Sequence, residues 1–220
     1  MSFAFRVSHL KQAPGLTAVL LALACSVLAP MAAGAQGGPD LALDARSQGS
    51  KTAPVTVYEM ADFQCPYCRD FALQTLPTIE KEYIRTGKVR WIFINLPIPS
   101  IHHNAVAAAE FAVCAAHQGK FWQAHDMLYG THDRWENLKN PGPFFQAQMP
   151  ALGLKQEAML TCLSSGVGAA AVRDDLAGAE RSGAHSTPTF YIEGGMLDGA
   201  QPIEVFRRIL DSVYKSKTTK

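Results

Sequence analysis

The sequence lacks an excess of charge of either sign. Its 220 residues include 20 Lys and Arg and 19 Asp and Glu, for a formal net charge of +1 at pH 7. Because the two signs are interspersed, the chain gives no reason to expect binding to nucleic acid or to an anionic membrane surface. The sequence also lacks internal repeats and low-complexity tracts. Its length favours one globular domain with a sizeable core.

A second C-x-x-C pair is also missing. Cys65 and Cys68 stand three positions apart, whereas Cys114 and Cys162 are lone residues on separate predicted helices. A structural zinc site needs four ligands in a recognisable pattern, so we expect no metal site and no cofactor.

The N-terminal segment has the pattern of a secretory signal peptide. Arg6 and Lys11 precede an apolar run, and small residues follow up to Ala35. We expect cleavage after Ala35, which removes residues 1–35 and exports the mature chain, most simply to a periplasm. Two alternatives stay open: a retained membrane anchor, and a lipoprotein in which Cys25 carries the lipid.

Export places four cysteines in a compartment where thiols tend to be oxidised. An even number is what paired cysteines would give. Cys114 and Cys162 are therefore predicted to form a structural disulfide, with two buried free thiols as the alternative. In the chain-entropy model such a bridge stabilises the fold by on the order of 4 kcal/mol.

The first half of the mature chain has the pattern of a βαβ unit. Residues 36–50 are polar and contain glycine, so they are predicted to be a flexible lead-in. A strand over 55–60 is followed by a helix that begins at Pro66 and is kinked at Pro77. An apolar run over 88–96 predicts the next strand, parallel to the first.

The second half changes character twice. Residues 102–182 predict helix after helix, which is far longer than an ordinary crossover. A strand over 189–193, a tight Gly194-Gly195 turn, a second short strand and an amphipathic helix follow. The fold class is therefore α/β, in the order β-α-β, helical insertion, β-β-α, and 51–220 is predicted to be one domain with its insertion.

The cysteine pair lies where a strand ends and a helix begins. Backbone N–H groups and the helix dipole at that point favour a thiolate on Cys65, which is the form that attacks a disulfide. Cys68, inside the first turn, is expected to be less exposed and to resolve the mixed disulfide. This arrangement predicts a redox pair. A zinc ligand pair and an inert structural disulfide are the alternatives, although so small a loop would add little stability.

Three segments carry a resemblance to a known family. The stretches "EMADFQCPYCRDF", "QGKFWQAHDMLY" and "STPTFYIEGG" resemble the DsbA family of exported thiol–disulfide oxidoreductases. The resemblance covers nearly the whole mature chain. It implies a thioredoxin-like fold interrupted by a helical domain. It also implies that the substrates are reduced or unfolded exported proteins, and that a membrane redox partner recycles the chain.

The resemblance implies a substrate-binding loop opposite the cysteines. Thr187 and Pro188 would form it, with Pro188 in a cis peptide bond, and the backbone of Thr187 would pair with a bound peptide as with an extra strand. Pro66 and Tyr67, between the cysteines, would line the same surface.

The resemblance also implies a buried acid below the cysteines. Glu59 would be this acid and would relay the proton of Cys68, with an ordinary exposed strand carboxylate as the alternative. Asp62 is interpreted as a turn or capping residue. His185, three residues before Pro188, is predicted to lie near the cysteines and to tune the thiolate.

Two residues bear on the direction of electron flow. Tyr67 stands where strong oxidants of the family often have histidine, and Thr187 resembles the isomerase and reductase branch. The 36–50 segment is too short to be a dimerisation domain, so a monomeric oxidase is favoured over an isomerase or reductase. A non-catalytic peptide chaperone or Cu(I) carrier is the third hypothesis.

The remaining histidines do not form a metal-binding motif. Their spacing assures no shared face, so we interpret them as surface or capping residues. They are His102, His103, His117, His125 and His132.

Overall fold

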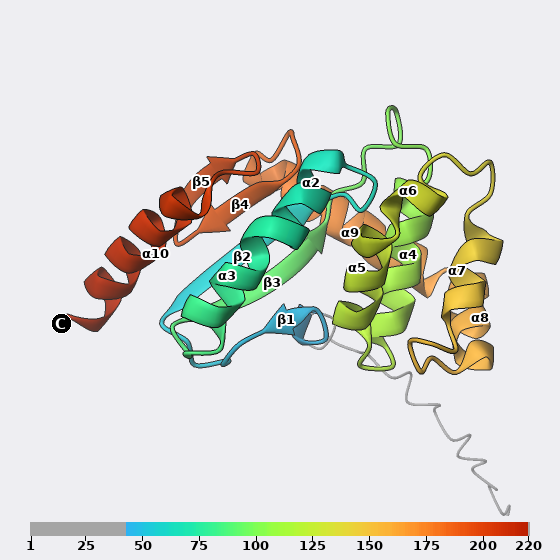
Figure 1. The fold of residues 1–220 in the computed structure, drawn as a ribbon, viewed down its shortest axis with the longest axis horizontal. Coiled ribbons are helices and arrows are strands. Elements are labelled where there is room, and N and C mark those ends of the chain that lie inside the picture. Colours follow the sequence, from blue (N-terminus) through green and yellow to red (C-terminus); the bar gives the residue numbers. More distant parts are fainter. Residues whose placement is uncertain (1–42, 220) are drawn as a thin grey trace, which may run out of the picture. The chain divides into compact units, whose positions relative to one another are not determined.

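A five-stranded mixed sheet organises the fold. The computed structural model describes residues 43–219 (Figure 1). In this part of the chain the strands lie in the order β1-β3-β2-β4-β5. β2 and β3 are parallel, and the other neighbouring strands are antiparallel. The strands are β1 (Ser47–Gln48), β2 (Val55–Ala61), β3 (Val89–Asn95), β4 (Thr189–Ile192) and β5 (Gly195–Asp198).

A long, irregular helical stretch connects β2 to β3. It consists of α2 (Pro66–Asp70), the π-helical segment η1 (Phe71–Thr75), α3 (Leu76–Ile79) and a second π-helical segment, η2 (Glu80–Ile84). Pro77 has no N–H to donate, which breaks the regular hydrogen-bond ladder. The disturbance predicted at Pro77 is therefore present, with one π-helical segment on either side. Figure 1 shows α2 and α3 crossing one face of the sheet.

Six further helices lie between β3 and β4. They gather beside the sheet, and the disulfide between Cys114 and Cys162 ties α4 to α8, which is the predicted pairing (Figure 1). Gly168 lets α9 approach α4, because an added Cβ would come within 3.1 Å of the Cys114 Sγ. The helices are α4 (Ala105–Ala116), α5 (Phe121–Gly130), α6 (His132–Trp135), α7 (Gly142–Gln148), α8 (Gln156–Ser165) and α9 (Val167–Ser182); α10 (Ile203–Thr218) closes the chain.

Cys65 and Cys68 belong to one buried cluster, and a second buried cluster, which includes the Trp91 that hydrogen-bonds Glu59, is rich in aromatic side chains. Trp91 of β3 stacks on Phe71 at a centroid distance of 5.9 Å, and Phe190 and Phe206 pack around the same pair. All four are buried. Since β2 and β3 are covered on both faces, their near-continuous apolar sequences match a buried parallel pair.

The prediction of a flexible lead-in over residues 36–50 is wrong for residues 43–50, the part that the structure describes. Ser47 and Gln48 pair with β3, and Arg46 is buried in an ion pair with Asp175 of α9. A two-residue strand is too short to give a periodic signal.

The predicted signal peptide over 1–35, its cleavage site after Ala35 and Cys25 all lie outside the described residues. Between residues 43 and 219, none of the helices is both long enough and apolar enough to span a membrane.

Candidate active site

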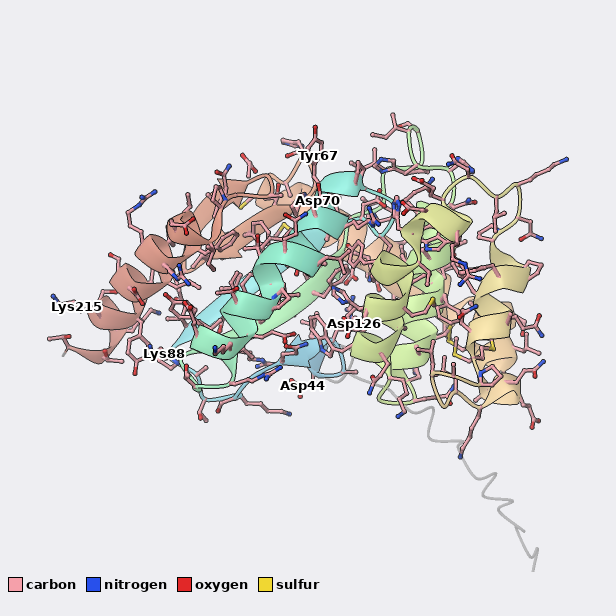
Figure 2. The ribbon with its side chains drawn as sticks, viewed as in Figure 1. Asp44, Tyr67, Asp70, Lys88, Asp126 and Lys215 are labelled. Atoms are coloured by element: carbon pink, nitrogen blue, oxygen red, sulfur yellow. A yellow bond between two sulfur atoms is a disulfide. The ribbon has the colours of Figure 1, made fainter. Side chains whose placement is uncertain are left out.

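The two close cysteines lie at the junction of β2 and α2. Cys65 is the N-cap residue, with φ −72° and ψ 124°, and Pro66 occupies the first helical position. Proline suits that position because its missing N–H would have no partner there. The Cys65 carbonyl accepts the N–H of Arg69 at 3.1 Å and so starts the helix. Figure 2 shows Tyr67 pointing outward from the tip of α2.

Asp62 fixes the turn before Cys65. Its buried carboxylate accepts the N–H of Gln64 at 2.8 Å and the N–H of Ile98 at 2.9 Å. The same carboxylate lies 2.8 Å from Nδ1 of His102. The turn role expected of Asp62 is therefore confirmed, and the carboxylate also ties the turn to the loop after β3.

The two thiols differ in burial and in acidity. Cys65 is 4% exposed and Cys68 is 0% exposed, so Cys65 is more covered than its predicted attacking role suggests, although the expected order holds. Hydrogen bonds lower the pKa of Cys65 to about 6, and the largest contribution comes from the Cys68 thiol. Thr187 and the N–H groups of Cys68 and Tyr67 act in the same direction, whereas burial raises the pKa. Burial, and then the Cys65 sulfur, raises the pKa of Cys68 well above its usual range.

The Thr187–Pro188 loop lies against Cys65. Their peptide bond is cis, and the Thr187 carbonyl accepts the Cys65 thiol at 3.4 Å. Pro188 is buried, while Pro66 and Tyr67 are exposed, Tyr67 by 65%. The fold thus brings together residues 122 positions apart.

His185 is different from its neighbours in this loop. It is exposed, and the largest effects on the pKa of Cys65 come from Cys68, from burial and from Thr187. The role of His185 in tuning the thiolate stays a prediction.

Glu59 is completely buried on β2. Its Oε2 accepts the indole N–H of Trp91 at 2.8 Å, and its Oε1 has no hydrogen-bond partner among the described residues. Burial raises the pKa of Glu59 to about 7, against the opposing effects of His125 and of the Trp91 hydrogen bond. The alternative of an exposed strand carboxylate is therefore wrong.

Two histidines predicted to have surface or capping roles are buried. His125 of α5 is 2% exposed, and His132 of α6 is 3% exposed. The spacing of His125 from Phe121 and Leu128, both fully buried, follows one face of a helix, and this pattern could have predicted its burial. The Nε2 of His132 lies 2.9 Å from the Gln64 carbonyl, so His132 supports the active-site turn.

One cluster of metal-ligating side chains occurs in the described part of the chain. His132, Asp133 and Glu136 each offer one ligand atom, and these atoms lie within 4.8 Å of one another. Arg69 of the active-site helix already pairs with Asp133 at 3.1 Å. The protein's own groups therefore account for this cluster, and we assign it no ion.

Two further residues near the cysteines are absent from the predicted site. Trp91 holds Glu59, and the Tyr129 hydroxyl donates to the Asp62 carbonyl at 3.3 Å. Burial is the first cause that raises the pKa of Tyr129 well above its usual range, followed by the negative groups Cys68 and Glu59. No local sequence signal marks either residue, because each acts through a contact with a distant segment.

Comparison with known proteins gives matches of three kinds. A family model described as Thioredoxin matches residues 42–212. A probable disulfide bond formation protein D of Bacillus anthracis is 30% identical over 157 residues, which cover 70% of this chain and 71% of that protein. The crystal structure of alpha-DsbA1 from Wolbachia pipientis superposes with a TM-score of 0.70 at 23% identity, covering 79% of this chain and 92% of that one. The predicted thioredoxin-like fold is confirmed.

Longer relatives contain a similar segment. The Na(+)/H(+) antiporter NhaA 3 of Salinispora tropica is 33% identical over 169 residues, which cover 77% of this chain. The match spans 24% of that antiporter, so this chain corresponds to about a quarter of its length.

Proposed function

We propose that Cys65 and Cys68 exchange a disulfide with other exported proteins. The chain belongs to the DsbA-type thiol–disulfide oxidoreductases of the thioredoxin family. The observation that carries this proposal is the asymmetry of the two sulfurs. The pKa of Cys65 is lowered to about 6, whereas that of Cys68 is raised well above its usual range. An attacking or leaving thiolate and a protonated resolving thiol are what such an exchange requires.

The exchange begins on the oxidised pair. A substrate thiolate attacks the Cys65 sulfur, the Cys65–Cys68 bond breaks, and a substrate–Cys65 disulfide forms. The electron pair of the broken bond stays on Cys68, which leaves as a thiolate. A second substrate thiolate then attacks the substrate sulfur, and Cys65 leaves. The substrate is oxidised to a disulfide, and the pair is reduced to a dithiol.

Glu59 supplies the proton that Cys68 needs. A thiolate is strongly disfavoured on the fully buried Cys68. Because the pKa of Glu59 is raised to about 7, a large part of this acid is protonated at neutral pH. A group that titrates near the working pH transfers protons in both directions. Glu59 therefore protonates Cys68 during substrate oxidation and accepts the proton again during recycling.

Thr187, Pro66 and Tyr67 form the substrate surface around Cys65, and the buried Pro188 holds the Thr187 backbone in place behind it. The Thr187 carbonyl already hydrogen-bonds the Cys65 thiol, so backbone groups of this loop lie beside the sulfur under attack. An extended peptide that pairs with the loop would bring its cysteine to Cys65. The exposed ring of Tyr67 offers an apolar contact next to it.

The cellular setting follows from the same proposal. The mature chain acts after export, in a periplasm, on reduced or unfolded exported proteins. A membrane redox partner reoxidises Cys65 and Cys68. The chain works as a monomer and needs no metal or cofactor for the exchange.

Two cysteine variants test the exchange. Cys65→Ser should abolish catalysed oxidation of a reduced, unfolded substrate protein, because the attacked sulfur is gone. Cys68→Ser, given a substrate that already contains a disulfide, should instead accumulate a mixed disulfide, because the Cys65 thiolate attacks the substrate bond and no Cys68 thiol follows to release it. A non-reducing gel shows this species. Full catalysis by Cys65→Ser would refute thiol exchange at this site.

The redox potential of the pair decides the direction of exchange. An oxidase needs a potential above that of its substrates' disulfides, and its pair should be isolated largely oxidised from cells. A mainly reduced pair in the exported protein would instead favour the isomerase or reductase. Thiol trapping of freshly lysed cells measures this.

A further inference from the structure

Two buried polar atoms lack hydrogen-bond partners on the side of the sheet that carries the cysteines. They are Oε1 of Glu59 on β2 and Nε2 of His125 on α5, and neither has a partner within residues 43–219. Their residues are 0% and 2% exposed. Leaving a buried polar group unpaired costs on the order of 1–3 kcal/mol, so two of them in one region call for a functional reason.

Phe93 lies next to both Glu59 and His125. It is the direct neighbour of Glu59 in the parallel register of β2 and β3. Its ring lies 5.7 Å from the His125 ring, at an interplanar angle of 84°. His125 also acts electrostatically on the Glu59 carboxyl group. The buried nitrogen of His125 therefore belongs to the same enclosed region as the acid.

The other side of the His125 ring contacts an exposed carboxylate. Its Nδ1 lies 2.8 Å from Oδ1 of Asp126, whose side chain is 79% exposed. Figure 2 labels Asp126 on α5, next to the helical stretch that follows Cys65. A single imidazole thus has one nitrogen in the core and the other hydrogen-bonded to a solvated carboxylate.

The buried Glu59 needs a route by which protons pass between it and solvent. Cys68 gains one proton and loses one in each cycle, and both Cys68 and Glu59 are 0% exposed. The other titratable groups around them are Cys65, Asp62 and Tyr129. Asp62 already accepts hydrogen bonds on both oxygens, and the Tyr129 hydroxyl donates to the Asp62 carbonyl. Within residues 43–219, His125 both acts on Glu59 and has a buried nitrogen without a partner.

We propose that His125 is a positioning residue that conducts protons between the buried Glu59 and the exposed Asp126. This inference rests on the proposed function. The Nε2 of His125 and the Oε1 of Glu59 do not hydrogen-bond each other within residues 43–219, so one water has to carry the proton between them. After Glu59 has given its proton to the Cys68 thiolate, His125 releases its Nε2 proton towards Glu59 and takes one up at Nδ1 from the solvated side. One proton moves from solvent to Cys68, and no electrons pass through the relay. During recycling the steps run in reverse.

The test compares His125→Gln and Asp126→Asn with the control His117→Gln, which alters an exposed histidine at the end of α4. The first readout is the pKa of Glu59. It is measured by NMR titration of the carboxyl carbon of Glu59 in the reduced protein, without turnover. His125→Gln should raise this pKa, because His125 acts electrostatically to lower it in the wild type. The control should leave it unchanged.

The second readout is the rate at which the mixed disulfide on Cys65 is formed and resolved. His125→Gln should slow the proton-dependent step by about a hundredfold or more, in the range of a lost acid–base group, with an enlarged solvent isotope effect. The pKa of Cys65 should not change. Asp126→Asn should slow the same step by a smaller factor, and its exposed position makes it the safer variant if His125→Gln does not fold.

The outcomes separate the two proposals. If His125→Gln folds and has wild-type exchange rates and an unchanged Glu59 pKa, the relay is overturned. If His125→Gln does not fold, a wild-type exchange rate in Asp126→Asn overturns the relay instead. If the wild-type protein catalyses no exchange, the proposed function fails. The Glu59 titration then still decides on its own whether His125 is coupled to the acid.

Discussion

Two buried carboxylates, Glu59 and Asp175, are held in opposite ways. Glu59 accepts one hydrogen bond, from Trp91, and its second oxygen has no partner in the described structure. Asp175 of α9 is paired with Arg46 and accepts hydrogen bonds from the backbone and the side chain of Asn95, at 3.0 and 2.7 Å. The first carboxyl group acts electrostatically on Cys68, and the second joins α9 to β3 and to the segment before β1.

The difference shows how one fold uses buried acids for two purposes. A carboxylate that meets a fixed cation and several donors stays charged and contributes to structure. A carboxyl group with too few partners avoids its charge, so burial raises its pKa to about 7 in the case of Glu59. The under-satisfied acid is the one that we propose exchanges protons with Cys68.

The strongest test of this contrast removes the partner of Asp175. Arg46→Met should lower the free energy of unfolding by about 3–5 kcal/mol, because it leaves a buried carboxylate without its cation. Denaturant titration at neutral pH measures this. The matched control is Arg207→Met, which removes the surface partner of Glu82 and should change stability little. Equal effects of the two substitutions would contradict the structural role given to Asp175.

The second test uses the pH dependence that Glu59 imposes. Its pKa is about 7 in the folded protein against 4.5 as the reference, so the folded state binds more protons between these values. Stability should therefore fall as pH rises from about 4.5 to 7, by on the order of 3 kcal/mol from this group. Glu59→Gln should remove this slope and be more stable than the wild type above pH 7.

The control for this slope is Glu157→Gln, at an exposed position of α8. It should keep the wild-type pH profile. A Glu59→Gln profile identical to that of the wild type would mean that the buried carboxyl group does not titrate in this range.

The third and smallest test changes the single donor to Glu59. Trp91→Phe removes the indole N–H, which stabilises the charged form of the acid. The pKa of Glu59 should rise further, by about one unit, which corresponds to about 1.4 kcal/mol. NMR titration of the carboxyl carbon measures it. Phe206→Leu, which alters the same aromatic cluster without touching the hydrogen bond, should leave that pKa near its wild-type value.

The parts of the site that could be predicted from the sequence are those with a local signal. The strand before Cys65 and the helix after it follow from apolar patterning and from Pro66. Thr187 and Pro188 were expected near the cysteines through the family resemblance, since the loop stands 122 positions from Cys65. Nothing in the sequence pattern around residue 187 indicates that this loop lies next to Cys65 in the folded chain.

The parts that could not be predicted depend on long-range contacts between single side chains. Arg46 and Asp175 are 129 positions apart, and Trp91 lies 32 positions from Glu59. Hydrophobic periodicity locates strands and helices but does not show which polar residues meet across them. For this reason Arg46 was assigned to a flexible lead-in, and His125 to a surface or capping role.

The central claim is that the β2–α2 junction holds a reactive thiolate on Cys65 beside a protonated Cys68. The most direct measurement is the ultraviolet absorbance of thiolate in the reduced protein as a function of pH. One thiol should ionise near pH 6, and the second should ionise only well above pH 9. Two thiols that both ionise near pH 9, the reference value for cysteine, would contradict it.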